Sequence, residues 1–106
     1  MAQGLKLIWS PDALQDVDEI AEYISRDSAY YAQRVVEQII GAAEILPYQP
    51  QLGRVVPELG SPAVRERFVY SYRLIYAVRA SELHILAVIH GKRLLEAVEE
   101  RYQDDL

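Results

Sequence analysis

Three short apolar runs follow one another in the second half of the chain. They read VRERFV, SYRLIYAVR and LHILAVIHG and begin at residues 64, 71 and 83. Runs of this length that are rich in Val, Ile, Leu and Tyr are typical of strands, and a few turn-type residues separate them. The pattern therefore predicts three consecutive antiparallel strands.

The last two of these strands are apolar on both sides. In the middle strand, Leu74 and Tyr76 alternate with Ile75 and Ala77. In the last strand two apolar sets alternate, with Leu86 and Val88 on one side and, on the other, Ile85, Ala87 and Ile89. Since a strand that faces water on one side carries polar residues there, we expect both faces of the sheet to be covered, one of them by helices.

The first half of the chain begins with a short strand and an amphipathic helix. Residues 5–9 are apolar and end at Ser10 and Pro11, which together are typical of the start of a helix. Apolar residues at helical spacing then run to about Ser25. The acidic residues between them are assigned to the solvated side of the helix, and they are Asp12, Asp16, Asp18, Glu19 and Glu22.

A second helix follows after a very short link. Asp27 or Ser28 can cap it, and its apolar stripe extends to about Leu46. Gly41 lies within this helix, and we interpret it as a point of close approach to the neighbouring helix. The short link predicts an antiparallel helical hairpin laid across the sheet.

Proline and glycine dominate the next segment. Four of the five prolines fall within residues 47–63, together with two glycines, which predicts a loop without regular structure. After the three strands, residues 94–103 predict a short acidic helix. The order β, α, α, β, β, β, α predicts an α+β fold in a single domain spanning residues 1–106, with the first strand joining the sheet beside a later strand.

Composition and charge narrow the class of protein. The chain has no cysteine, which excludes disulfides, thiolate metal sites and a cysteine nucleophile. Neither a bilayer-spanning run nor a secretory signal is present, so we expect a soluble cytoplasmic protein without membrane association. The net charge of −5 argues against direct binding to nucleic acid. The charge is uneven, however, because residues 54–93 hold seven basic and three acidic side chains.

Six short motifs occur in order along nearly the full length of the chain. They are Ser10-Pro11-x-Ala13, Ile20-x-x-Tyr23-Ile24, Pro50-x-x-Gly53-Arg54, Arg65-Glu66, Tyr72-Arg73-Leu74-Ile75-Tyr76 and Ile89-His90-Gly91-x-Arg93. With this order and spacing the chain resembles the RelE/ParE toxin superfamily of bacterial type II toxin–antitoxin modules, and the ParE branch in particular. The resemblance implies the α+β fold predicted above.

The resemblance also implies one of two activities. ParE-like members inhibit DNA gyrase by protein contact and serve in plasmid stabilisation, whereas RelE-like members are metal-independent endoribonucleases that cut messenger RNA on the ribosome. The acidic balance argues against the RelE-like activity, because docking into ribosomal RNA depends on counterion release by basic residues. A third possibility is a non-toxic remnant that only binds its antitoxin.

In both branches a cognate antitoxin wraps the toxin with a helix and an added strand. A sheet that is apolar on both faces needs more cover than this chain is expected to supply. An apolar groove along the helical hairpin and an edge of the sheet are therefore predicted to accept the antitoxin.

Basic residues mark the predicted surface for the target or the antitoxin. The surface comprises Arg54, Arg65, Arg67, Tyr72, Arg73, Lys92 and Arg93. For the endoribonuclease alternative, His90 is the candidate acid or base, Arg73 and Arg65 are the candidate phosphate clamp, and Tyr72 or Glu66 assists. The structural interpretation is that His90 caps a strand end and Arg73 pairs with an acid from a helix. Neither activity calls for a cofactor, and the two histidines do not have the spacing of a metal site.

Overall fold

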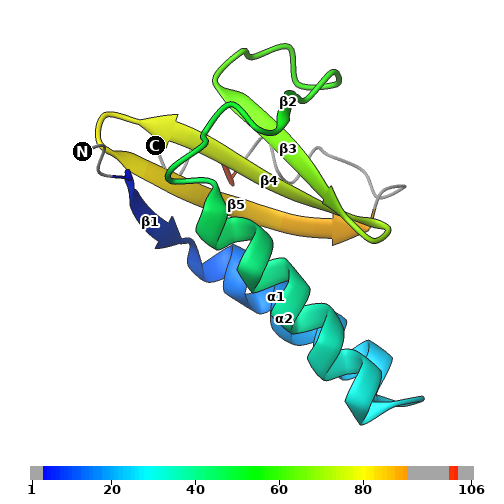
Figure 1. Cartoon of the computed structure of the whole chain (residues 1–106). Coiled ribbons are helices and arrows are strands. Elements are labelled where there is room, and N and C mark those ends of the chain that lie inside the picture. Colours follow the sequence, from blue (N-terminus) through cyan, green and yellow to red (C-terminus); the bar gives the residue numbers. More distant parts are fainter. Residues whose placement is uncertain (1–3, 91–100, 103–106) are drawn as a thin grey trace.

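The computed structural model describes residues 4–90 and 101–102. The named elements in order are β1 (Lys6–Trp9), α1 (Pro11–Ser25), α2 (Ala29–Ile45), β2 (Arg54–Val55), β3 (Val64–Val69), β4 (Tyr72–Arg79) and β5 (Glu82–His90). Figure 1 shows both helices on one side of the sheet and extending beyond it. The α+β class is confirmed, and so are the predicted strands and helices up to residue 90. The predicted helix at 94–103 lies outside the described residues except at 101 and 102.

The five strands form one sheet in the order β1-β5-β4-β3-β2. The predicted antiparallel meander is present, with Val64 opposite Ala77 and Tyr72 opposite His90. The first strand pairs with the last in parallel, with Lys6 opposite Glu82. The prediction that β1 joins the sheet beside a later strand is therefore confirmed.

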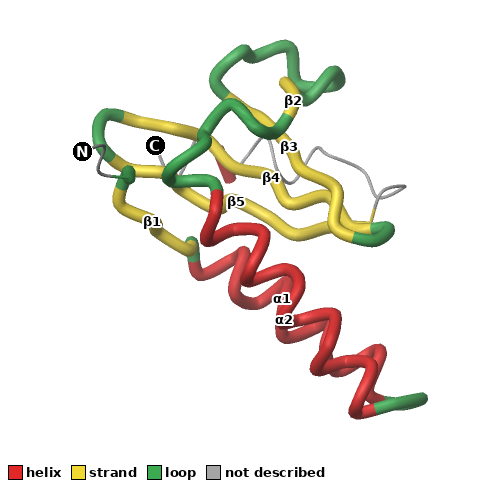
Figure 2. Tube along the Cα trace, viewed as in Figure 1, coloured by secondary structure: helices red, strands yellow, loops and turns green. Residues whose placement is uncertain are grey.

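Each helix begins at a serine that caps it. The Ser10 Oγ accepts a hydrogen bond of 3.0 Å from the Ala13 N–H, and the Ser28 Oγ accepts one of 3.0 Å from the Tyr31 N–H. Pro11 stands in the first turn of α1, where its missing N–H costs nothing. Figure 2 shows the resulting hairpin of two adjacent helices, as predicted. Of the two predicted caps of α2, the structure has Ser28.

The main core fills the space between this hairpin and one face of the sheet. The helices contribute Ala13, Val17, Val35, Ile39 and Ala43, and the strands contribute Val69, Leu74, Tyr76, Leu83, Ile85 and Val88. All of these residues are buried. The predicted helical layer on one face is confirmed.

A second, smaller core covers the opposite face. It comprises Val56, Val64, Ile75, Ala77, Leu86, Ala87 and Ile89, with Leu59 and Tyr102 packed against it. Val56 and Leu59 belong to the loop after β2. The loop therefore covers part of the face of the sheet for which the sequence indicated no covering segment.

A β-bulge in β5 changes which residues share a face. Ile75 lies opposite Ala87 and Tyr76 lies opposite Ile85, so Leu86 is the extra residue. The bulge shifts the alternation by one position, so that Ile85 faces the helices while Leu86 and Ala87 both belong to the second core. The prediction that Ile85 shares a face with Ala87 and Ile89 is wrong for this reason.

The proline-rich segment contains the two-residue strand β2. Arg54 and Val55 pair with Glu66 and Arg65 of β3 in antiparallel register. The prediction that residues 47–63 form no regular structure is therefore wrong at these two positions. The four prolines of the segment lie on either side of β2, where their missing N–H groups do not interrupt a ladder.

Tyr76 anchors this segment to the sheet. Its hydroxyl accepts a hydrogen bond of 2.9 Å from the Gly53 N–H and donates one of 2.8 Å to the Pro50 carbonyl. A Cβ at Gly53 would lie 2.5 Å from the Glu66 carbonyl oxygen and 2.7 Å from the Tyr76 hydroxyl. Only a glycine fits there without displacing β2 from β3.

Gly41 has no comparable role. A Cβ at this position would meet no atom of another element within 4 Å. The interpretation of Gly41 as a point of close approach is wrong, because no atom of the neighbouring helix comes this near.

No helix in the described ranges has the length and apolarity that a bilayer-spanning segment needs.

Candidate binding surface and its buried ion pairs

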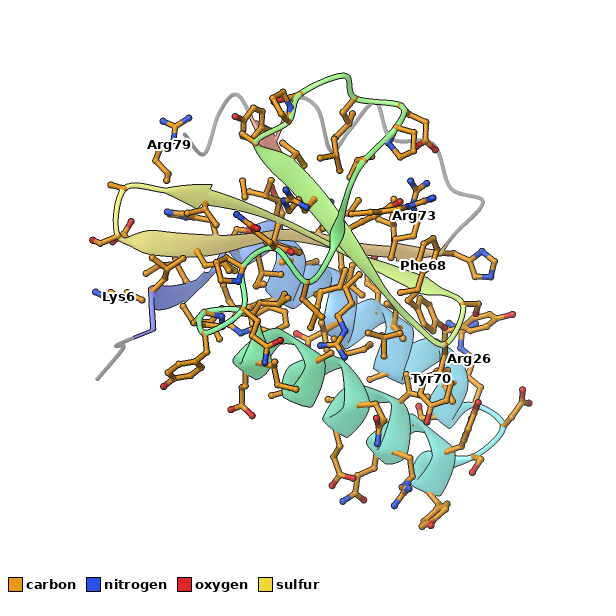
Figure 3. All side chains as sticks on the ribbon, turned by 45° about the horizontal axis from the view of Figure 1, so that its top comes forward. Lys6, Arg26, Phe68, Tyr70, Arg73 and Arg79 are labelled. Atoms are coloured by element: carbon orange, nitrogen blue, oxygen red, sulfur yellow. The ribbon has the colours of Figure 1, made fainter. Side chains whose placement is uncertain are left out.

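Four alternating charges meet on the face of the sheet turned away from the helices. The Glu66 carboxylate accepts hydrogen bonds from Arg54 Nε at 2.7 Å and from Arg73 Nε at 2.5 Å. Arg73 Nη1 and Nη2 donate to the two carboxylate oxygens of Glu58 at 3.0 and 2.9 Å. Figure 3 shows Arg73 on this side of the sheet. We call Arg54, Glu58, Glu66 and Arg73 the charged cluster.

Backbone geometry brings the charged cluster together. Glu66 lies opposite Arg54 of β2, and Phe68 lies opposite Arg73 of β4, so Glu66 and Arg73 are diagonal neighbours on one face. Glu58 comes from the loop that covers the second core. The prediction that Arg73 pairs with an acid from a helix is wrong, because the helices lie on the other face of the sheet.

Pairing compensates for burial in the charged cluster. The Glu66 side chain is fully buried and the Arg73 side chain is 5% exposed. Within the described residues, no buried side-chain nitrogen or oxygen atom lacks a hydrogen-bond partner. The hydrogen bonds from Arg73 hold the pKa of Glu58 below its ordinary value, and those to Glu58 raise the pKa of Arg73. The pair formed by Glu58 and Arg73 is therefore ionised at neutral pH.

Two members of the cluster also reach solvent. The Arg54 side chain is 60% exposed and the Glu58 side chain 53% exposed. The Arg54 guanidinium lies 5.4 Å from the centre of the Phe68 ring, which is itself exposed. The predicted binding residue Arg54 thus stands at the surface beside an aromatic ring, whereas Arg73 stands below it.

Arg65 and Arg67 point to the helical side of β3. Arg65 Nη1 donates to the Gly53 carbonyl at 2.7 Å, and Arg67 Nη1 donates to the Ala42 carbonyl at 3.3 Å. Ala42 lies in the last turn of α2, where carbonyl groups lack partners within the helix. Both arginines therefore join β3 to its neighbours.

Tyr72 and His90 form one side of a pocket of about 410 Å³. They lie opposite each other on β4 and β5, with their ring centres 6.0 Å apart. Asp16, Glu19 and Tyr23 of α1 contribute to the other side. Burial raises the pKa of the Tyr72 hydroxyl, and the neighbouring Tyr31 and Tyr23 raise it further.

The residues of the endoribonuclease alternative lie on two faces of the sheet. Arg65 and His90 are on the helical side, because their partners Tyr76 and Tyr72 pack in the main core. Arg73 is on the other side, opposite Ile89 of the second core. The structure therefore does not bring the three side chains together. The predicted binding residues Lys92 and Arg93 lie outside the described residues.

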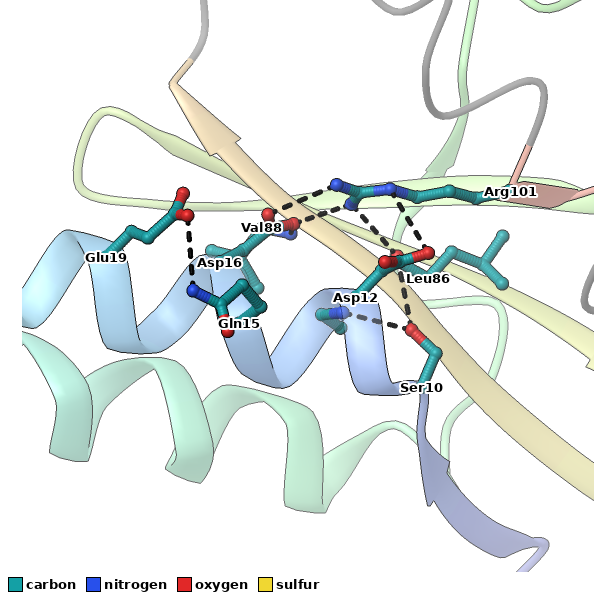
Figure 4. A network of polar contacts seen from close by, with 9 residues as sticks. Ser10, Asp12, Gln15, Asp16, Glu19, Leu86, Val88 and Arg101 are labelled. Carbon is teal, nitrogen blue, oxygen red and sulfur yellow. Dashed lines mark hydrogen bonds and ion pairs between the residues drawn. The ribbon is translucent and has the colours of Figure 1, made fainter.

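Asp16 carries a polar network that the hydrophobic pattern does not reveal. Its carboxylate accepts hydrogen bonds from the Val88 N–H at 3.0 Å and from Arg101 Nη1 at 2.7 Å, and Arg101 also forms an ion pair with Asp12 (Figure 4). The assignment of Asp16 to the solvated side of α1 is wrong, since it is 5% exposed. Its position three residues after Ala13 is the spacing of the buried stripe, which is the signal that the sequence offered.

A groove of about 510 Å³ runs between α1 and α2. Small or apolar side chains line most of it, and they are Ala21, Ser25, Ala29, Ala32 and Val36. Glu22, Gln33 and Glu37 complete the lining. The described residues hold no group of three or more His, Asp or Glu side chains placed to bind a metal ion.

Comparisons with known proteins agree with this fold. Residues 7–95 match a family model described as ParE toxin of type II toxin-antitoxin system, parDE. The chain is 32% identical over 90 residues to Toxin RelE2 of Caulobacter vibrioides, which covers 84% of this chain and 98% of that protein.

Two solved structures share the fold at lower sequence identity. The chromosomal ParDE TA system from P. aeruginosa has a TM-score of 0.72 and 21% identity, covering 86% of this chain and 100% of that chain. A mutant of the E. coli toxin RelE in the free state has a TM-score of 0.67 and 16% identity, and the match covers 98% of this chain and 99% of that chain.

Proposed function

Because this chain belongs to the ParE toxin family of type II toxin–antitoxin systems, we propose that it inhibits DNA gyrase by protein–protein contact and that a cognate antitoxin neutralises it. The position of Arg73 supports protein contact over RNA cleavage. Metal-free cleavage needs a cation at the phosphate and a proton-transfer group on the same side of the substrate. Arg73 is instead buried between Glu58 and Glu66, on the face opposite to His90.

A direct test compares two targets of the purified chain. The purified chain is added to DNA gyrase acting on relaxed plasmid and, separately, to ribosomes translating a defined messenger RNA. We expect loss of supercoiling and intact messenger RNA. Cleaved messenger RNA with normal supercoiling would instead establish the endoribonuclease alternative, and no effect in either assay would indicate a non-toxic remnant.

Histidine variants sharpen this test. His90→Ala removes the candidate acid or base, and His84→Ala is the matched control because His84 lies on the same strand and contacts Glu82 at 3.0 Å. A gyrase inhibitor keeps its activity in both variants. Loss of toxicity in His90→Ala alone would overturn the proposal.

The groove between α1 and α2 is the proposed binding site for a helix of the antitoxin. Small residues such as Ala29 and Ala32 let a partner helix approach closely, and Glu22 and Glu37 in the lining match a helix with basic flanks. β1 ends the sheet order, so its outer edge has no partner strand among the described residues and can accept an added strand.

A matched pair of variants tests the groove. Gln33 lines it, whereas Gln38 lies on the same helix, is exposed and does not line it. With the product of the neighbouring gene as the antitoxin, Gln33→Trp is expected to weaken binding at least about tenfold, and Gln38→Trp to leave it unchanged. Equal affinities would exclude the groove as the antitoxin site.

A further inference from the structure

The charged cluster contains two carboxylates in very different settings. Glu66 is fully buried on β3 and pairs with both arginines, so it is a permanent part of the sheet. Glu58 stands on a loop, its side chain is 53% exposed, and its side chain pairs with Arg73 at the rim of the cluster. One carboxylate is therefore fixed and the other is exchangeable.

We propose that the Nη1 and Nη2 atoms of Arg73 form a binding site for a carboxylate side chain of a partner protein, and that Glu58 occupies this site in the free chain. The identification of the partner as a protein rests on the proposed function. The site itself rests on the geometry of the charged cluster.

The Glu58 carboxylate shows how the ligand is held. Its two oxygens accept hydrogen bonds from Nη1 and Nη2 of Arg73 at 3.0 and 2.9 Å. This is the bidentate arrangement that guanidinium groups form with carboxylates. An Asp or Glu side chain of a partner makes the same two hydrogen bonds in the same place. Arg73 needs no rearrangement, because Glu66 holds its Nε at 2.5 Å.

Charge balance also favours one incoming carboxylate. Two arginines and two glutamates make the cluster neutral, so that it carries one positive charge when Glu58 swings away. The exposed Arg54, whose charge is already included in this sum, flanks the site together with Phe68, which adds an aromatic surface for the partner. The net charge of −5 on the chain favours a single acidic side chain over a strand of nucleic acid.

Release of Glu58 requires only a side-chain rotation. Val56 is fully buried and Leu59 packs against the second core, so the loop stays in place on both sides of Glu58. An ion pair of which one member is half exposed is weak and exchanges with competing ions. A partner carboxylate therefore competes with Glu58 rather than with the fold.

The experiment titrates the chain alone with a blocked glutamate, N-acetylglutamate N-methylamide. NMR signals of the Arg73 guanidinium nitrogens report binding in three proteins, namely the wild type, Glu58→Gln and the control Glu44→Gln. Glu44 is a matched control because it is exposed on α2 and lines neither the groove between the helices nor the charged cluster. The blocked glutamine analogue is the uncharged probe.

Removal of the internal competitor should tighten binding. An internal carboxylate that occupies the site about 90% of the time lowers the apparent affinity about tenfold, so Glu58→Gln is expected to bind the probe at least about tenfold more tightly than the other two proteins. The glutamine analogue is expected to leave the Arg73 signals unchanged. Equal affinities in all three proteins would overturn the proposal.

Two further arms keep the test decisive. Tighter binding of dimethyl phosphate than of the glutamate probe would overturn the assignment to a carboxylate and indicate nucleic acid. If Glu58→Gln does not fold, Glu58→Ala replaces it, and an affinity equal to that of the wild type contradicts the proposal. None of these measurements uses gyrase or an antitoxin, so failure here and failure of the proposed function are distinguishable.

Discussion

Glu66 and Arg73 are diagonal neighbours on β3 and β4, and their side chains meet at 2.5 Å in the interior of the protein. The face of the sheet away from the helices is thus held by an ion pair as well as by apolar contacts. Arg73 connects the sheet to the loop through Glu58, and Glu66 connects it to β2 through Arg54. The stability of this side of the molecule depends on both charges being present.

Replacement of Glu66 by glutamine should strongly destabilise the fold. The variant keeps the shape of the side chain but leaves the buried Arg73 without its nearest counter-charge, and breaking a buried ion pair costs about 3 kcal/mol or more. The free energy of unfolding from urea titration measures the loss. Glu37→Gln, at an exposed position, should change it by less than about 0.5 kcal/mol. A similarly small change for Glu66→Gln would show that the pair contributes little.

Gly53→Ala should also be destabilising. Its Cβ would lie 2.5 Å from the Glu66 carbonyl oxygen, and a backbone atom of a paired strand cannot move aside. We expect a loss of about 2 kcal/mol, as for other overpacked sites, measured by urea titration. The Tyr76 ring signals should shift in the same variant, since its hydroxyl bonds to Gly53. Unchanged stability would contradict the close approach of β2 to β3.

Gly41→Ala should act in the opposite direction. The position lies inside α2 and has open space around it, so the variant adds helix propensity without a clash. The expected gain is about 1 kcal/mol in the free energy of unfolding, seen as a higher midpoint of thermal unfolding. Destabilisation would reveal a contact at Gly41.

The contribution of Glu58 should depend on pH. Because hydrogen bonds from Arg73 hold its pKa below the ordinary value, the folded chain binds this proton more weakly than the unfolded chain. The stabilisation is complete above the ordinary carboxyl pKa of about 4.3 and is lost as the pH falls through the lower pKa of the folded state. The difference in unfolding free energy between the wild type and Glu58→Gln should therefore shrink between about pH 5 and pH 3. A difference that stays constant over this interval would show that Glu58 is unpaired in solution.

Local patterns predicted most of the elements because the forces that form them act over a few residues. Ser10 and Ser28 cap helices through N–H groups three positions away, and the alternation in β4 is a property of the strand itself. β2 was not predicted, because two residues are too few to show a pattern. The bulge at Leu86 was not predicted either, because two successive apolar residues look the same in the sequence whether or not the register of the strands shifts.

The sequence singled out Arg54, Glu66 and Arg73 of the charged cluster, but neither Glu58 nor the arrangement of the four side chains. The sequence by itself determined that arginines and histidines occupy the strands, because periodicity assigned those positions. Only the tertiary structure decided that Arg73 is buried beside Glu66, that His90 lies on the other face, and that Asp16 is turned inward to Val88. Each of these arrangements depends on pairing between segments far apart in the chain. The free-energy cost of burying a charge is compensated only when the folded chain brings its partner beside it.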